Sequence, residues 1–150
     1  MFINNKQAKR DDESTYKRLA EIIQIISDDK SVLLLQTIFL ASGDTSEVLR
    51  TRLKLGRKQY YSKMSRMSKA GLVKRQKGRY FVTAFGKVIY DAHRLLVSAV
   101  KNYWKLKAID SLGNLILLPK EERANVIERI INNQQIRQIL LSPDFSPRYQ

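Results

Sequence analysis

The sequence predicts a mainly helical fold with one small β-hairpin, an α+β class, on three observations. Apolar residues recur every three or four positions in several segments, as is typical of amphipathic helices. The strand-like runs 72–76 and 79–82 flank the turn pair Lys77-Gly78 and indicate a hairpin. Six Gly and three Pro in 150 residues leave little room for long linkers, so we expect residues 1–150 to form a single unit.

We expect the first helix over residues 13–26, after a polar and frayed segment 1–12. Its apolar positions at helical spacing are Tyr16, Leu19, Ile22, Ile23 and Ile26. A second helix is expected over residues 30–41, with Asp28 or Asp29 as its cap. This helix is apolar almost all round, which predicts burial on several sides.

The next segment predicts two helices joined by a short turn. Asp44 to Glu47 has the pattern of a capping box and opens a short helix that ends near Leu53. Leu55-Gly56 forms the turn, a third helix covers 57–70, and Gly71 provides a left-handed stop. Two helices around a three-residue turn that contains Gly are typical of a helix-turn-helix.

A long helix is expected after the hairpin, capped by Thr83 and running from Ala84 to about Leu112, where Gly113-Asn114 breaks it. Its apolar stripe is Val88, Ala92, Leu95, Leu96, Ala99, Tyr103, Leu106 and Ile109. After a connector at 115–118, Pro119 opens a further helix to about Asn132, and a last short helix carries Ile136, Ile139, Leu140 and Leu141.

The charge of the chain is concentrated in residues 48–90. These 43 residues hold 13 Lys or Arg and no Asp or Glu, whereas the whole chain holds 28 basic and 14 acidic residues. The rest therefore carries 15 basic and 14 acidic side chains, a net charge of +1. Because solubilising faces mix both signs, a folded block of one sign indicates a site for a polyanion.

The periodicity of the segment 57–70 separates a core face from an outward face. Tyr60, Met64 and Met67 lie four and three residues apart, and we expect them in the core. A recognition helix presents its N-terminal half to base edges, where Arg or Lys pairs with guanine and Gln with adenine. The residues expected to contact DNA are Arg57, Lys58, Gln59, Tyr61, Ser62, Ser65, Arg66, Lys74, Arg75, Lys77, Arg79, Arg52 and Lys54.

Two sequence runs carry a resemblance to a known family. The runs are Met64-Ser65-Arg66-Met67-Ser68-Lys69-Ala70-Gly71-Leu72-Val73 and, after the basic hairpin, Thr83-Ala84-Phe85-Gly86-Lys87. They resemble winged helix-turn-helix transcriptional regulators of the ArsR and MarR kind, including small archaeal examples, with Met64 and Met67 in place of leucines. The resemblance implies a winged helix-turn-helix core over 28–92, with double-stranded DNA as its partner.

The helices outside this core, 13–26 and 93–141, are expected to hold a homodimer. The expected interface residues are Leu95, Ala99, Tyr103 and Leu106, on the surplus apolar stripe of the long helix. For Tyr103 and Trp104, an interface or ligand-pocket role and plain core packing stay open. A small-molecule effector cannot be named from the sequence.

The remaining function classes find little support in the sequence. There is no Cys, His93 is the one histidine, and no HExxH motif, Gly-rich phosphate loop or Ser elbow occurs, so we expect no enzyme, no cofactor and no metal. No signal-peptide core or membrane-spanning run is found, which predicts a cytoplasmic protein without a membrane partner. Two alternatives stay open, a non-specific architectural DNA-binding protein and a winged-helix module that binds proteins.

Overall fold

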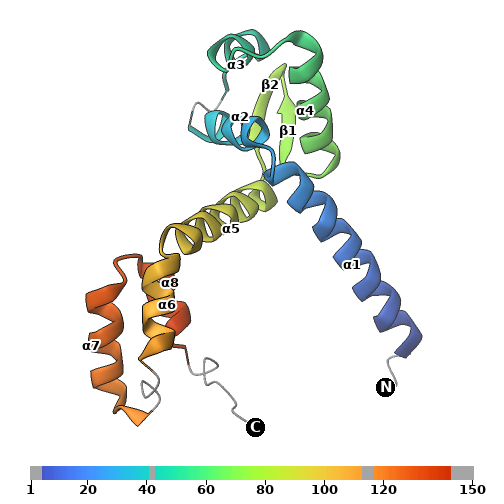
Figure 1. Cartoon of the computed structure of the whole chain (residues 1–150). Coiled ribbons are helices and arrows are strands. Elements are labelled where there is room, and N and C mark those ends of the chain that lie inside the picture. The colour runs from blue at the N-terminus through green and yellow to red at the C-terminus, as the bar shows by residue number, and fades with distance from the viewer. Residues whose placement is uncertain (1–4, 41–42, 113–116, 143–150) are drawn as a thin grey trace. The chain divides into compact units, whose positions relative to one another are not determined.

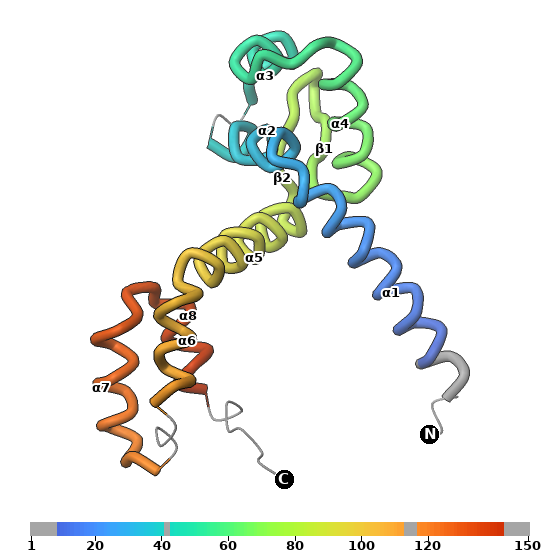
Figure 2. The backbone as a smooth tube through the Cα atoms, viewed as in Figure 1, coloured from blue at the N-terminus to red at the C-terminus, as the bar shows by residue number. Residues whose placement is uncertain are grey.

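A computed structural model describes residues 5–40, 43–112 and 117–142, which form eight helices and one two-stranded sheet (Figures 1 and 2). The elements are α1 (Asn5–Ile26), α2 (Asp29–Leu40), α3 (Ser46–Arg52), α4 (Arg57–Lys69), β1 (Val73–Gln76), β2 (Arg79–Val82), α5 (Ala84–Lys101), α6 (Tyr103–Ser111), α7 (Lys120–Ile130) and α8 (Gln134–Leu140). The chain divides into two compact units: unit 1 covers residues 1–91 and unit 2 covers 92–150. The predicted mainly helical class with one hairpin is confirmed.

The core of unit 1 lies between α2, α3, α4 and the hairpin. β1 contacts α4, β2 contacts α2, and the C-terminal end of α1 contacts α2 (Figure 1). The predicted core face of α4 is confirmed, because Tyr60, Met64 and Met67 are each at most 1% exposed. Burying one such side chain stabilises the fold by about 1.5–3 kcal/mol. The buried apolar side chains are Ile22, Ile25, Leu34, Leu35, Ile38, Leu49, Leu55, Tyr60, Met64, Met67, Leu72, Val73, Tyr80 and Tyr90.

Helix α4 ends in a left-handed turn at Gly71, as the sequence predicts. Gly71 has φ +81°, its N–H donates to Ser68 O at 3.0 Å, and the N–H of Leu72 donates to Met67 O at 2.9 Å. This pair of hydrogen bonds is the Schellman motif, which needs a residue that adopts positive φ without strain. The motif turns the chain from α4 directly into β1.

Side-chain caps define two further helix ends. Asp28, one of the two predicted caps, accepts a hydrogen bond from the N–H of Ser31 at 3.0 Å. Thr83 accepts from the N–H of Gly86 at 2.9 Å, and its own hydroxyl donates to Gly71 O at 2.5 Å. The cap of α5 is thereby tied to the end of α4.

The predicted capping box before α3 does not form. Thr45 occupies the N-cap position, but its side chain makes no cap hydrogen bond. Glu47 instead pairs with Arg50 at 3.2 Å, one turn along the helix. The carboxylate therefore interacts with a cation on its own helix rather than with the backbone at the helix start.

The hairpin matches its prediction closely. Val73 pairs with Val82 and Gln76 with Arg79 in an antiparallel register. Lys77 and Gly78 both have positive φ, +49° and +78°, which is the backbone of a type I′ turn. The twist of such a turn matches that of the strands, so the two-residue loop closes the hairpin without splaying it.

Two helix boundaries differ from the prediction. α1 begins at Asn5 and not near residue 13. Residues 5–10 (Asn-Lys-Gln-Ala-Lys-Arg) include several good helix formers, so local propensity favours a helix that extends beyond its apolar stripe. Apolar periodicity by itself places the start of this helix too late.

The expected long helix over 84–112 is interrupted at Asn102, which separates α5 from α6. The Asn102 side-chain amide donates to Ser98 O at 2.8 Å, and its backbone N–H is shared between Ser98 O and Ala99 O at 3.0 and 3.1 Å. Asn side chains compete with the backbone for such carbonyls and disturb helix interiors. The expected break at Gly113-Asn114 lies outside the described residues, and so does the start of the 115–118 connector.

Unit 2 has a small core of its own, formed by α6, α7 and α8. Ile109, Ile131 and Ile136 are buried in this core, and Leu95 and Leu106 pack against it. Asn133 caps α8 by accepting from the N–H of Ile136 at 3.0 Å. The guanidinium of Arg137 donates to Ile131 O and, at 2.9 Å, to Glu128 O, which satisfies carbonyls at the C-terminal end of α7.

Candidate nucleic-acid interface

The 13 basic residues of segment 48–90 divide into two groups in the structure. Four of them pair with carboxylates and are at least partly neutralised. These pairs are Arg50–Glu47 at 3.2 Å, Arg52–Asp44 at 3.1 Å, Lys63–Asp28 and Lys87–Asp91 at 2.8 Å. The Lys63 hydrogen bond, with that of Ser31 second, lowers the pKa of the Asp28 carboxyl below its ordinary value.

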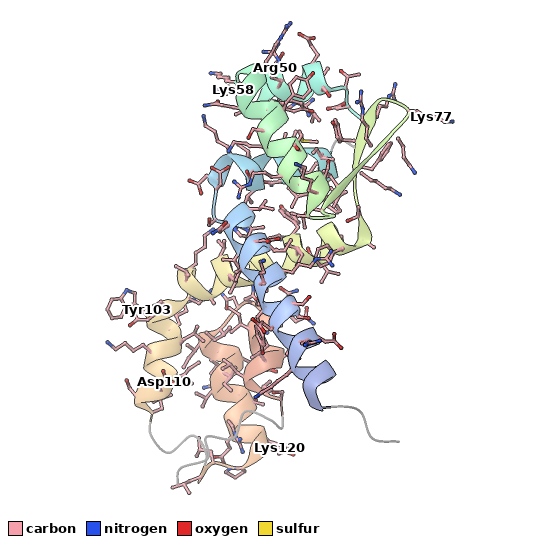
Figure 3. All side chains as sticks on the ribbon, turned by 90° about the vertical axis from the view of Figure 1, so that its right-hand side faces the viewer. Arg50, Lys58, Lys77, Tyr103, Asp110 and Lys120 are labelled. Atoms are coloured by element: carbon pink, nitrogen blue, oxygen red, sulfur yellow. The ribbon has the colours of Figure 1, made fainter. Side chains whose placement is uncertain are left out.

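The other nine, thirteen minus four, have no carboxylate partner among the described residues, and all nine side chains are exposed. They are Lys54, Arg57, Lys58, Arg66, Lys69, Lys74, Arg75, Lys77 and Arg79. All nine belong to unit 1 and come from the α3–α4 turn, α4 and the hairpin. Figure 3 shows Lys58 on α4 and Lys77 at the hairpin tip directed outward. Uncompensated cations on one folded unit create a positive potential of several kT at its surface.

The start of α4 adds backbone donors to this charge. Gly56 occupies the N-cap position without a side-chain cap, and the first turn holds no acidic residue. The unpaired N–H groups and the positive end of the helix dipole therefore face solvent beside Arg57 and Lys58. This combination of backbone N–H groups and exposed cations suits an anionic ligand such as a phosphate.

The outward face of α4 follows the side opposite Tyr60, Met64 and Met67. Every residue predicted for DNA contact on this helix is exposed: Arg57, Lys58, Gln59, Tyr61, Ser62, Ser65 and Arg66. Tyr61 is 56% exposed and meets the buried Tyr60 ring edge-on at 5.2 Å. Its ring is therefore supported from within and accessible from outside.

The turn before α4 is built differently from the expected Leu55-Gly56 turn. Lys54 is the left-handed residue, with φ +51°, and Leu55 is buried behind it. The N–H of Leu55 donates to Arg50 O at 3.0 Å and that of Lys54 to Thr51 O at 3.1 Å, a second Schellman motif. A lysine thus occupies a position that favours glycine, and its side chain is exposed to solvent.

The hairpin supplies four exposed cations on a short, two-stranded support. Arg75 lies over the ring of Tyr80, its cross-strand partner, at 5.8 Å, and Tyr80 itself is buried. Arg79 packs against Gly43, where an added Cβ would lie 3.6 Å from its side chain. The guanidinium of Arg75 and the side chain of Arg79 are therefore held against the fold, while both residues stay exposed.

Two of the predicted assignments change. Arg52 is paired with Asp44, so it is less available to a phosphate than its sequence position suggests. Lys69 was not among the predicted contacts, yet it is exposed and has no carboxylate partner among the described residues. Its signal in the sequence is its spacing, three residues after Arg66 and four after Ser65 on the same helix face.

The residues expected to form a dimer interface lie in unit 2. Leu95 and Leu106 pack against the core of their own unit and Ala99 is half-buried, whereas Tyr103 is 54% exposed. Two of the four side chains therefore serve intramolecular packing. The assignment of an interface to this stripe stays a prediction.

A scan of family models and a search of curated proteins give no significant match. A solved structure similar to the chain is the activation domain of the phage T4 transcription factor MotA. The sequence identity is 20%, the alignment covers 59% of this chain and 97% of that chain, and the TM-score is 0.45. The resemblance to ArsR- and MarR-type regulators stays a prediction.

Two features of the described residues bear on other functions. They contain no group of three or more His, Asp or Glu side chains placed to hold a metal ion. None of the described helices combines the length and the apolar content needed to cross a membrane.

Proposed function

We propose that the protein is a DNA-binding transcriptional regulator with a winged helix-turn-helix in unit 1. In this proposal α3 and α4 form the helix-turn-helix, α4 enters the major groove, and the β1–β2 hairpin is the wing. The observation that carries the proposal is the set of nine exposed cations without a carboxylate partner in the described chain. Their elements follow one another in the order that a groove-binding helix and its wing require.

The proposed contacts fall into two kinds. Lys58 and Arg66 on the outward face of α4 are placed to pair with guanine, and Gln59 with adenine. The cations of the hairpin and of the α3–α4 turn contact phosphates, which set position and affinity but carry no sequence information. Sequence preference therefore depends on α4, and salt-dependent affinity depends on all nine cations.

The homodimer expected from the sequence finds its best support in α1. Tyr16, Leu19 and Ile23 are 69%, 45% and 50% exposed and share one face at steps of three and four. Residues 9–23 carry four basic and four acidic side chains. A mixed-sign helix with an apolar seam can pair with a second copy of itself, because cations of one copy can face carboxylates of the other.

Selection of bound sequences from a random pool of duplex DNA tests the regulator proposal. We expect an enriched motif that the protein prefers over random DNA by at least about a thousandfold at physiological salt. Enrichment of no motif would instead indicate a non-specific architectural protein, and absence of DNA binding would favour a module that binds proteins. A palindromic motif together with a dimer in sedimentation would support pairing through α1, and a monomer at micromolar concentration would exclude it.

Single substitutions test the division of roles. Arg66→Ala should weaken binding to the selected site more than binding to random DNA, whereas Lys77→Ala should weaken both by similar factors. Lys120→Ala removes an exposed lysine of unit 2 and serves as the matched control, with unchanged binding expected. A changed sequence preference in Lys77→Ala would contradict the phosphate-binding role of the hairpin.

A further inference from the structure

An exposed apolar patch lies on α5 and α6, within unit 2 and outside the proposed DNA site. We define the patch as Leu96, Val97, Val100, Tyr103 and Trp104, which are 59%, 37%, 76%, 54% and 74% exposed. Tyr103 and Trp104 meet edge-on at 5.1 Å, and Figure 3 shows Tyr103 standing out from the ribbon. Isolated exposed apolar residues are ordinary, but a contiguous group with two large aromatics marks an interaction surface.

The patch has the geometry of a helix-pairing seam. Hydrogen bonds from the Asn102 N–H to Ser98 O at 3.0 Å and from the Leu106 N–H to Asn102 O at 2.9 Å carry the helical period across the break. Positions 96, 100 and 103 and positions 97, 100 and 104 then form two adjacent rows with steps of three and four. Such rows match the apolar face of a second helix.

The opposite side of the same helices is already occupied. Leu95, Leu106 and Ile109 pack into the core of unit 2 and hold α5 and α6 in place. The patch is therefore presented by a supported surface, and a partner helix need not order the segment on binding.

The charge beside the patch has a single sign. Residues 92–107 contain Arg94, Lys101, Lys105 and Lys107 and no Asp or Glu. All four basic side chains are exposed, and Arg94, Lys101 and Lys105 are spaced by seven and four, which places them along one edge of the patch. Lys107 lies over the Trp104 ring at 5.2 Å.

We propose that this patch docks an amphipathic helix of another protein, one with an apolar face flanked by Asp or Glu. A second copy in an antiparallel two-fold contact fits poorly, because that contact would bring the two basic edges together. This distinguishes the patch from the α1 seam, where both signs are present. Single-stranded nucleic acid fits poorly too, because Leu96, Val97 and Val100 offer no ring for base stacking and Lys107 covers one face of Trp104.

Trp104 is the one tryptophan of the chain, so its fluorescence reports directly on the patch. The probe is a synthetic helical peptide of about 20 residues with Leu at the a and d positions of each heptad and Glu at the flanking positions. One comparison peptide carries Lys in place of Glu, and another carries Ser in place of Leu. We expect the Leu/Glu peptide to shift Trp104 emission to the blue and to bind the full chain at least tenfold more tightly than either comparison peptide.

Two variants localise the binding. Val100→Asp should lower the affinity for the Leu/Glu peptide at least tenfold. Leu117→Asp changes an apolar residue outside the patch that is 80% exposed, and it should leave this affinity unchanged. The double variant Lys101→Glu, Lys105→Glu should reverse the preference toward the Leu/Lys peptide. Because all these side chains are exposed, the fold should tolerate the changes, which circular dichroism checks.

Several outcomes would overturn the proposal. Equal affinity for the Glu and Lys peptides would remove the role of the basic edge. If vesicles of phosphatidylglycerol and phosphatidylcholine shift Trp104 emission to the blue while the Leu/Glu peptide does not, that result would assign the patch to a lipid surface. Loss of a sedimenting dimer in Val100→Asp would assign it to a second copy of the chain, and quenching by oligo-dT without a peptide effect would assign it to nucleic acid.

Discussion

Gly86 at the start of α5 packs against the backbone of Leu72, just before the hairpin, and its substitution by alanine tests the packing of unit 1. An added Cβ would lie 2.0 Å from the carbonyl oxygen of Leu72 and 3.0 Å from Val82 Cγ1. A Cβ atom needs a separation of at least 3.0 Å from the Leu72 oxygen, so the two backbone segments would have to move apart by about 1 Å from the 2.0 Å found here. The same Leu72 carbonyl accepts the backbone N–H of Thr83 at 3.0 Å, so this hydrogen bond would be strained.

The magnitude follows from these contacts. Overpacking costs about 1–3 kcal/mol, and one weakened hydrogen bond costs about 1 kcal/mol. We therefore expect Gly86→Ala to lower the free energy of unfolding of unit 1 by roughly 2–4 kcal/mol. At about 4 °C or more per kcal/mol for a unit of this size, its Tm should fall by roughly 8 °C or more.

Urea and thermal unfolding followed by far-ultraviolet circular dichroism measure this loss. Gly56→Ala is the matched control, because an added Cβ at Gly56 meets no atom within 4 Å and φ is −63°. It should cost less than about 1 kcal/mol, the scale of an N-cap change. A loss below about 1 kcal/mol in Gly86→Ala would refute the close approach of α5 to Leu72.

Two further predictions concern the ion pair of Asp28 and the turn at Lys54. Because the folded-state pKa of Asp28 is lowered, its contribution to stability is complete above its unfolded value of about 3.9 and is lost as the pH falls toward the folded value. Asp28→Asn should therefore flatten the pH dependence of urea unfolding in this acidic range, and an unchanged dependence would contradict the pairing with Lys63. Lys54→Gly should raise the stability of unit 1 by about 1 kcal/mol, because glycine adopts the positive φ without strain. The same change should weaken DNA binding, and the affinity of the variant should fall less steeply with added salt than that of the wild type. A higher affinity for DNA would exclude Lys54 from the site.

Local features of the sequence predicted much of the fold. The Lys77-Gly78 pair, the left-handed Gly71 and the caps at Asp28 and Thr83 depend on residues a few positions apart, and the structure confirms all of them. The spacing of Tyr60, Met64 and Met67 likewise placed them in the core. Periodicity failed where local chemistry opposed it: α1 extends on helix propensity, and Asn102 divides the expected long helix.

The sequence by itself determined that positive charge gathers in one folded segment, and it placed the outward residues of α4. It could not determine which cations lack an acidic partner, because the pairing of Lys63 with Asp28 joins residues 35 positions apart. Nor could it separate Leu95, which packs in a core, from Leu96, which is 59% exposed. Charge neutralisation and burial depend on neighbours in space, and the tertiary structure alone supplies those neighbours.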